Sequence, residues 1–84
     1  MRENIQERIS RLISNILETD YRLIGKEENL IDDVGIDSMG FLELSIWIQR
    51  EFQFLVSIEK WRELHTVSDL IDLIETISKE KEVL

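Results

Sequence analysis

Apolar residues near the beginning of the chain recur at intervals of three and four positions. They are Ile5, Ile9, Leu12, Ile13, Ile16 and Leu17. Such spacing places one apolar stripe along an amphipathic helix, which we predict over about residues 3–18. The polar residues 18–20 end this periodicity, and a long ordered loop without strand-like alternation is expected to follow. We expect three apolar residues to anchor that loop on the helices: Leu30, Ile31 and Val34.

A second helix is predicted over about residues 38–52. Asp37 can cap its start, because an aspartate carboxylate accepts hydrogen bonds from backbone N–H groups two or three residues later. One side of this helix carries Phe41, Leu44, Ile48 and Phe52. Another side carries Met39, Leu42 and Ile46, and Trp47 adds a third apolar position. The apolar arc is too wide for burial against one core, so we expect part of this helix to contact something else.

The segment from Phe54 to Ile58 is apolar enough for a strand. No second strand-like segment in the sequence can pair with it, so we interpret it as a loop. Ser57 is suited to cap a short helix over about residues 58–63, which would direct Trp61 and Leu64 into the core.

The last helix is predicted over about residues 67–79, with fraying expected from residue 78 onward. Thr66 and Asp69 have the spacing of a capping box at its start. Its buried stripe is Val67, Leu70, Ile71, Ile74 and Ile77. The predicted fold is therefore all-α: a small antiparallel bundle of three long helices and one short third helix. A chain of 84 residues is expected to form one domain over residues 1–84.

The composition excludes several functions. The formal net charge of −8 repels nucleic acid and anionic membranes, and it favours partners with basic surfaces. The chain contains no cysteine, so disulfides, thiolate metal sites and its own thiol chemistry are excluded. No apolar run approaches the roughly 20 residues that span a bilayer, and no signal-peptide pattern is found. We expect a cytoplasmic monomer without stable membrane insertion.

The residue most indicative of chemistry is Ser38, in the motif Gly35-Ile36-Asp37-Ser38-Met39. A catalytic serine needs a base and a group that orients the base. His65 is the only histidine, and a lone histidine beside a helix cap is more typical of a surface residue, so we predict no role for it. A hydrolase is the weakest interpretation, and we predict that Ser38 is a point of attachment.

A wider pattern surrounds this serine. It comprises residues 30–39, the run Leu42-Glu43-Leu44, Phe52, and residues 66–71. With these features at mid-chain, the sequence resembles the acyl carrier proteins of the phosphopantetheine-binding class over nearly its whole length. The resemblance implies that Ser38 carries 4′-phosphopantetheine, which a phosphopantetheinyl transferase donates from coenzyme A. Acyl groups would then be held as thioesters on the terminal thiol of this group.

The resemblance also implies where partners bind. In the family the second helix is the recognition helix, and Met39 and Glu43 match its contact positions. The acidic residues Asp32 and Asp33 match the stretch where basic enzyme surfaces dock, while Asp37 and Met39 flank the attached group. Expected partners are acyl-ACP synthetases, ketosynthases or acyltransferases with basic or apolar docking surfaces. The carboxylates lack the spacing of a calcium loop, so we predict no structural metal.

The sequence departs from the family pattern in its second helix and in the loop after it. Gly40 replaces a commonly acidic residue and is expected to leave room beside Ser38, and Gln53 replaces a usual glycine. The prolines common in the following loop are missing, so we expect residues 53–65 to be atypical. A helix poor in charge but containing Trp47 indicates partners that recognise shape and apolar contact. We therefore hypothesise a carrier dedicated to one pathway, with Trp47 either contacting a partner or the acyl chain or packing in the core.

Two alternatives to an acyl carrier stay open from the sequence. One is an aminoacyl or peptidyl carrier of the nonribosomal type, which the net charge of −8 makes less favourable. The other is a helical adaptor whose Ser38 is never modified. The sequence also leaves open whether an acyl chain enters the helix bundle, because the apolar stripes are equally explained as a closed core.

Overall fold

The structure is a computed structural model that describes residues 4–82, with side chains described to residue 78. Within this range there are four helices: α1 (Ile5–Ile16), α2 (Ser38–Phe52), α3 (Ile58–Glu63) and α4 (Val67–Glu82). The described residues contain no strand, and their only sheet-like feature is an isolated bridge between Asn29 and Thr66. The predicted all-α fold is confirmed, and residues 54–57 form a loop as expected.

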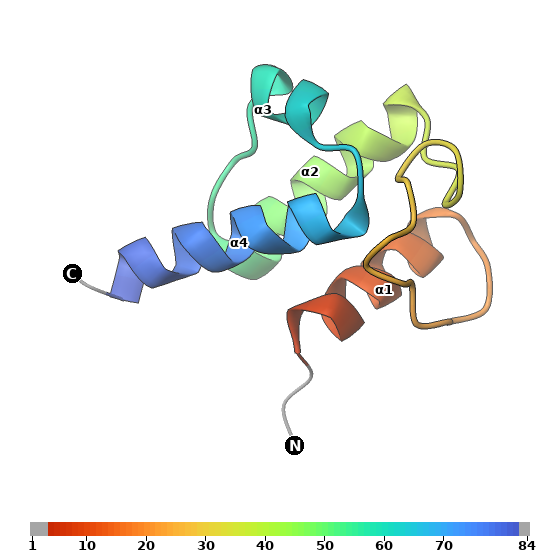
Figure 1. The fold of residues 1–84 in the computed structure, drawn as a ribbon, viewed down its shortest axis with the longest axis horizontal. Helices are drawn as coiled ribbons and strands as arrows, with labels where there is room; N and C mark the ends of the chain where they lie inside the picture. Colours follow the sequence, from red (N-terminus) through yellow and green to blue (C-terminus); the bar gives the residue numbers. More distant parts are fainter. Residues whose placement is uncertain (1–3, 83–84) are drawn as a thin grey trace.

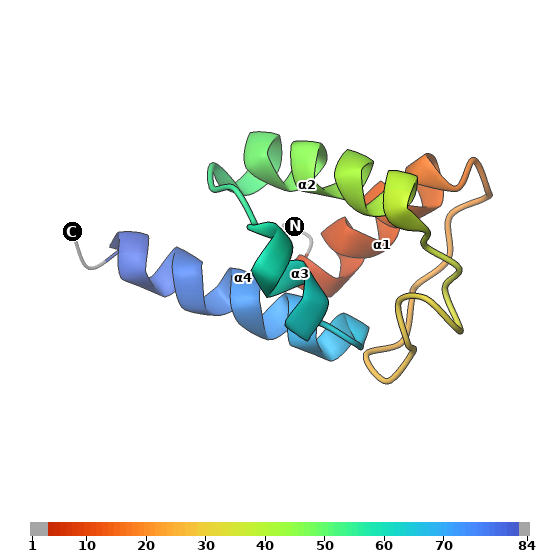
Figure 2. The ribbon, with the colours of Figure 1, turned by 90° about the horizontal axis from the view of Figure 1, so that it is seen from above.

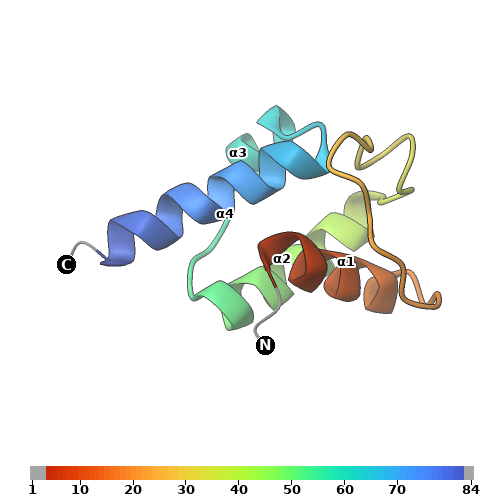
Figure 3. The same cartoon turned by 60° about the horizontal axis from the view of Figure 1, so that its bottom comes forward.

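The three long helices surround the core, and α1 runs in the opposite direction to α2 and α4 (Figure 1). Both α2 and α4 contact α1. The short helix α3 lies between the end of α2 and the start of α4 (Figure 2). The connection from α1 to α2 passes beside the start of α4 (Figure 3). Its backbone is fixed there by hydrogen bonds from Leu30 N–H to the His65 carbonyl (2.8 Å) and from Val67 N–H to the Glu28 carbonyl (3.0 Å).

The core consists of aliphatic residues from α1, α2, α4 and the two loops. Its fully buried members include Ile9, Ile13, Ile24, Leu30, Ile36, Leu44, Ile48, Val67, Leu70 and Ile74. The predicted stripes of the long helices therefore face the core, except for Ile77 of α4, which is half-buried and not among the residues packed there. The expectation that Ile31 anchors the loop was wrong, because its side chain is 60% exposed. The Asn29 Oδ1 atom accepts hydrogen bonds from the N–H groups of Ile31 and Asp32, both at 2.9 Å, and this turn directs Ile31 outward.

The helix boundaries differ slightly from the predictions. The predicted start of the first helix, residue 3, lies outside the described residues; Asn4 caps α1 through a capping box with Glu7. The helix ends at Ile16, two residues early, because Glu18 adopts a left-handed conformation (φ 56°). At the other end of the chain, α4 continues to Glu82, so its backbone is helical where fraying was expected.

The predicted caps of the two C-terminal helices are confirmed. Ser57 Oγ accepts a hydrogen bond from Lys60 N–H (3.2 Å) at the start of α3. At the start of α4, the N–H groups of Thr66 and Asp69 each donate to the other residue's side chain, at 3.1 and 3.2 Å. Asp69 also accepts from His65 N–H (2.9 Å), and these backbone donors lower the pKa of its carboxyl group. The caps fix the loop between α3 and α4.

Candidate functional site

Ser38 is the first residue of α2 and its side chain is exposed. The preceding residue, Asp37, caps the helix as predicted, with its Oδ1 accepting a hydrogen bond from Gly40 N–H at 2.8 Å. Just before this cap, Ile36 is buried and Gly35 has a φ of +88°, which favours glycine. Among the described residues, the Ser38 hydroxyl has no hydrogen-bond partner. The site therefore presents an exposed and unengaged hydroxyl at the first residue of α2.

Gly40 has a packing role that the sequence did not indicate. It is buried, and a Cβ atom added there would lie 3.0 Å from Ile36 Cγ2 and 3.4 Å from Asp37 Oδ1. Its small size thus allows α2 to approach the turn before Ser38. The expectation that it leaves room for an attached group was wrong, because the space beside it is already filled.

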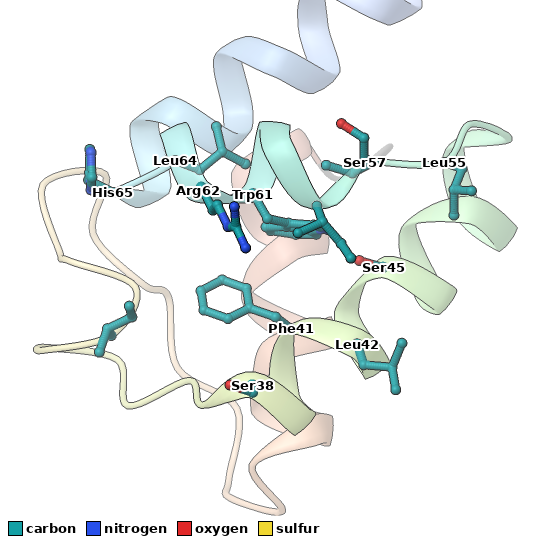
Figure 4. A pocket seen from close by; sticks show the side chains of 13 residues that line it. Ser38, Phe41, Leu42, Ser45, Leu55, Ser57, Trp61, Arg62, Leu64 and His65 are labelled. Carbon is teal, nitrogen blue, oxygen red and sulfur yellow. The ribbon is translucent and has the colours of Figure 1, made fainter.

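A cavity of about 820 Å³ lies between α2, α3 and the loop that joins them. Ser38 is at its rim, and Phe41, Ser45, Val56, Trp61 and Leu64 are among the residues that line it (Figure 4). The lining is mostly apolar. An apolar cavity adjoining an exposed hydroxyl can hold a hydrocarbon chain attached through that hydroxyl.

Trp61 forms one wall of this cavity. The sequence had instead predicted that it lies in the core. It is half-buried and packs against the core, with its ring centroid 5.1 Å from that of Phe41. The reason is the short length of α3, which has no buried residue and lies over the core instead of within it. Trp61 Nε1 is buried and has no hydrogen-bond partner among the described residues.

Two basic side chains also line the cavity, Arg62 and His65. Arg62 extends from α3 toward Phe41, whereas the His65 imidazole points away from Ser38 (Figure 4). No hydrogen bond joins Ser38 and His65 in the part of the chain that the structure describes. The geometry therefore contains no Ser–His pair of the kind that activates a serine nucleophile.

The residues predicted to contact partners are all exposed. Asp32 and Asp33 lie in the preceding loop, and Asp33 Oδ2 accepts a hydrogen bond from Asn29 N–H at 2.7 Å. Met39 is 65% exposed, and Glu43 is exposed on the same helix.

The wide apolar arc predicted for α2 is confirmed. Together with Met39, the exposed residues Leu42, Ile46 and Trp47 leave an apolar surface along the helix. Trp47 is 39% exposed, with the Arg50 guanidinium 5.5 Å from its ring centroid. It is therefore a surface residue and not part of the core. Among the described residues, no cluster of histidine, aspartate or glutamate that could hold a metal is found.

Sequence reasoning missed the cavity residues outside α2. Leu55 and Ile58 line the cavity and are 69% and 68% exposed. A signal was present: the segment from Phe54 to Ile58 is apolar, yet it has neither a strand partner nor a place in a helical stripe. Apolar residues that neither pair in a sheet nor pack in a helical stripe indicate a binding surface.

Comparison with known proteins identifies the family of the chain. Residues 7–74 match the family described as PP-binding, phosphopantetheine attachment site. The chain is 33% identical to an acyl carrier protein of Buchnera aphidicola over 79 residues, which cover 94% of this chain and 99% of that protein. The chain belongs to the phosphopantetheine-binding acyl carrier family. It is also 38% identical over 55 residues to the acyl carrier protein AcpXL of Mesorhizobium japonicum, covering 66% of this chain and 59% of that protein.

Family membership fixes the general role. Acyl carrier proteins are carriers whose cargo other enzymes process, so the protein is a carrier and not an enzyme, and its cofactor is phosphopantetheine. Members of the family interact with a phosphopantetheinyl transferase and with biosynthetic enzymes. The peptidyl carrier and adaptor alternatives are not favoured by these relatives. Among residues 4–82, no helix is both long and apolar enough to cross a membrane.

Proposed function

We propose that Ser38 is the attachment point of 4′-phosphopantetheine and that the cavity beside it receives the acyl chain. The observation that carries this proposal is the position of Ser38. Its unengaged hydroxyl lies at the start of α2 and at the rim of an apolar cavity of about 820 Å³. An attached arm can therefore extend into solvent to meet enzymes or fold back over the cavity.

The attachment chemistry fits this position. The Ser38 oxygen attacks the phosphorus of coenzyme A nearest the pantetheine arm, and a new phosphate ester forms as the pyrophosphate bond breaks. The adenosine bisphosphate leaves, and the hydroxyl proton passes to a base, which the transferase must supply because His65 points away. The arm brings the thiol that the cysteine-free chain lacks.

The start of α2 favours the charge that the arm adds. Unpaired N–H groups and the positive end of the helix dipole stabilise a phosphate ester there. The first turn of α2 contains no acidic residue. The carboxylate of Asp37 is engaged with Gly40 N–H, and we place it beside the arm as a positioning group. Met39, which follows Ser38, would flank the arm on the exposed side.

Partner enzymes would approach along α2 and the preceding loop. Asp32, Asp33 and Glu43 offer negative charge to a basic surface, whereas Met39 and Trp47 offer apolar contact. Transferase, acyl-ACP synthetase, ketosynthase and acyltransferase are the expected partners. The mainly apolar contact surface of α2 supports a carrier dedicated to one pathway, since few charges are available for general recognition.

The decisive experiment is modification of the apo protein by coenzyme A and a broad-specificity phosphopantetheinyl transferase. Intact mass spectrometry of the wild type should show the gain of one phosphopantetheinyl group. The Ser38→Ala variant should show none, while Ser57→Ala, which alters another serine of the same cavity, should be modified like the wild type. Modification of Ser38→Ala, or absence of any gain in folded wild type with several transferases, would refute the assignment.

A further inference from the structure

A cationic side chain lines the apolar cavity without a partner of its own. Arg62, on α3, is one of the cavity residues, and it makes no hydrogen bond or ion pair within the part of the chain that the structure describes. Lys60 of the same helix is paired with Glu63 at 3.4 Å. Glu59 lies three residues before Arg62, a spacing that allows an ion pair on a helix, yet no bond joins the two. The Arg62 guanidinium is therefore free to bind a group outside the chain.

The direction of this side chain distinguishes it from an ordinary solvated arginine. Arg62 extends from α3 toward Phe41, and Phe41 lies between it and Ser38 in Figure 4. Phe41 follows Ser38 by three residues on α2, so both side chains lie on one face of that helix. Trp61, which precedes Arg62, packs on Phe41 with ring centroids 5.1 Å apart. This ring contact holds the base of the Arg62 side chain near the first turn of α2.

The cavity itself offers no anion to this guanidinium. Most of its lining residues are apolar, and the polar ones other than Arg62 are three serines and His65. Asp37, the carboxylate next to Ser38, is engaged with Gly40 N–H at 2.8 Å. Charged hydrogen bonds are stronger beside apolar surface than in bulk water, because the local dielectric constant is lower. An anion that enters the cavity would therefore find Arg62 as its partner.

We propose that Arg62 binds an anionic oxygen of the load attached to Ser38. A guanidinium carries several N–H donors in a planar fork that fits a phosphate or a carboxylate, and its charge strengthens each hydrogen bond. Attachment at Ser38 places such an anion, the phosphate ester, at the rim of the same cavity. Arg62 would then hold the load over the cavity. The inference rests on the proposed attachment at Ser38, so the test must verify loading before it examines Arg62.

Two parts of the load can supply the anionic oxygen. One is the phosphate of the arm, in which case Arg62 orients every load alike. The other is a carboxylate on the acyl group, in which case Arg62 makes the cavity selective for dicarboxylic acyl groups. Both sources offer the same chemistry to the guanidinium. The experiment must therefore compare loads that differ only in a terminal carboxylate.

The test follows the side-chain Nε–H signal of Arg62 in ¹⁵N–¹H spectra, recorded at mildly acidic pH where its exchange with water is slow. Intact mass first confirms complete loading with phosphopantetheine alone, with octanoyl phosphopantetheine or with its dicarboxylic counterpart, suberoyl phosphopantetheine. A hydrogen bond to an anionic oxygen moves the Nε–H proton downfield. A shift already present with phosphopantetheine alone assigns the oxygen to the phosphate, and the ³¹P signal should then differ between wild type and Arg62→Gln. A shift with suberoyl only assigns it to the carboxylate.

Variants separate the charge of Arg62 from its shape and position. Arg62→Gln removes the guanidinium, and Arg62→Lys keeps the charge but loses the planar fork. The difference in melting temperature between loaded and apo protein should be more positive in the wild type than in Arg62→Gln, with Arg62→Lys between them. Arg50→Gln is the matched control, because it removes an arginine that lies over Trp47, outside the cavity, and it should match the wild type.

The outcomes are distinguishable. Full loading with an unchanged Arg62 signal in every form would overturn the proposal and leave Arg62 as a solvated surface residue. Failure to load would instead refute the attachment at Ser38.

Discussion

The rings of Phe41 and Trp61 lie 5.1 Å apart, tilted by 55°, and join α3 to the first turns of α2. Phe41 is three residues from Ser38, so the contact lies beside the proposed attachment point. Helix α3 has only six residues and none is buried, so few other packing contacts hold it against the core. The ring contact therefore helps to fix the wall of the cavity.

This contact should be measurable as a coupling energy. Phe41→Leu and Trp61→Leu each remove one ring while retaining an apolar side chain. Tilted aromatic pairs contribute about 0.5–1.5 kcal/mol beyond the area they bury. Urea denaturation of the wild type, both single variants and the double variant should yield a coupling in that range. Strictly additive losses would show that the two rings contribute independently.

The helices and caps were predictable because their signals are local. Asp37 and Gly40, like Thr66 and Asp69, lie three residues apart, so the sequence alone specifies which side chain meets which backbone group. The stripes of the long helices likewise follow from the helical repeat. The motif around Ser38 could likewise be recognised, because it is a continuous run of residues.

The cavity was not predictable, because it depends on how distant segments pack. Trp61 was expected in the core, since aromatic residues usually are buried, but only the placement of α3 over Phe41 determines its exposure. The prediction that Ile31 is buried was wrong for a similar reason. The hydrogen bond from its N–H to Asn29 Oδ1 orients its side chain outward, and this bond cannot be inferred from the apolar pattern.

Gly35 should be intolerant of substitution for a purely conformational reason. Its φ is +88°, and an added Cβ atom would meet nothing within 4 Å. Gly35→Ala should therefore cost about 1–2 kcal/mol through backbone strain alone. Gly25→Ala is the matched control, because that glycine lacks a positive φ and its Cβ would meet only the Glu28 side chain, with Oε2 at 3.4 Å and Cγ at 3.8 Å, which are ordinary contacts. Urea denaturation of both variants tests this, and equal losses would contradict the strain argument.

Glu18 offers the opposite case, where glycine should stabilise the fold. It follows α1 with a φ of 56°, and its N–H and that of Thr19 donate to the carbonyls of Asn15 (3.1 Å) and Ser14 (3.0 Å). This arrangement is a Schellman motif, which usually has glycine at this position. Relief of strain is partly offset by the greater freedom of glycine in the unfolded chain.

We therefore expect Glu18→Gly to raise the free energy of unfolding by about 0.5–1 kcal/mol. Glu18→Ala is the control, because it removes the same charge from the end of α1 but keeps the strained conformation. The midpoint of urea unfolding should increase for the glycine variant above that of the alanine variant. If both variants gain equally, removal of the negative charge explains the effect, and backbone strain does not.

Glu28 should make the stability of the loop depend on pH in the acidic range. Both its oxygens accept hydrogen bonds from the Arg22 guanidinium, at 2.6 and 2.8 Å, and Oε2 also accepts one from Gly25 N–H at 2.7 Å. The side-chain bonds to Arg22, followed by the bond from Gly25, lower the pKa of Glu28 from 4.5 to about 2. The folded state thus favours the ionised form more than the unfolded chain does.

Because this pKa is lowered on folding, the stabilisation is fully present above about pH 4.5 and is lost as the pH falls toward 2. Glu28→Gln removes the titrating group but keeps a side chain of similar size. The difference in free energy of unfolding between wild type and variant should be constant near neutral pH and should decrease steadily below pH 4.5. Urea denaturation at a series of pH values measures it. A difference that does not vary with pH across this range would show that the ion pair with Arg22 does not stabilise the loop.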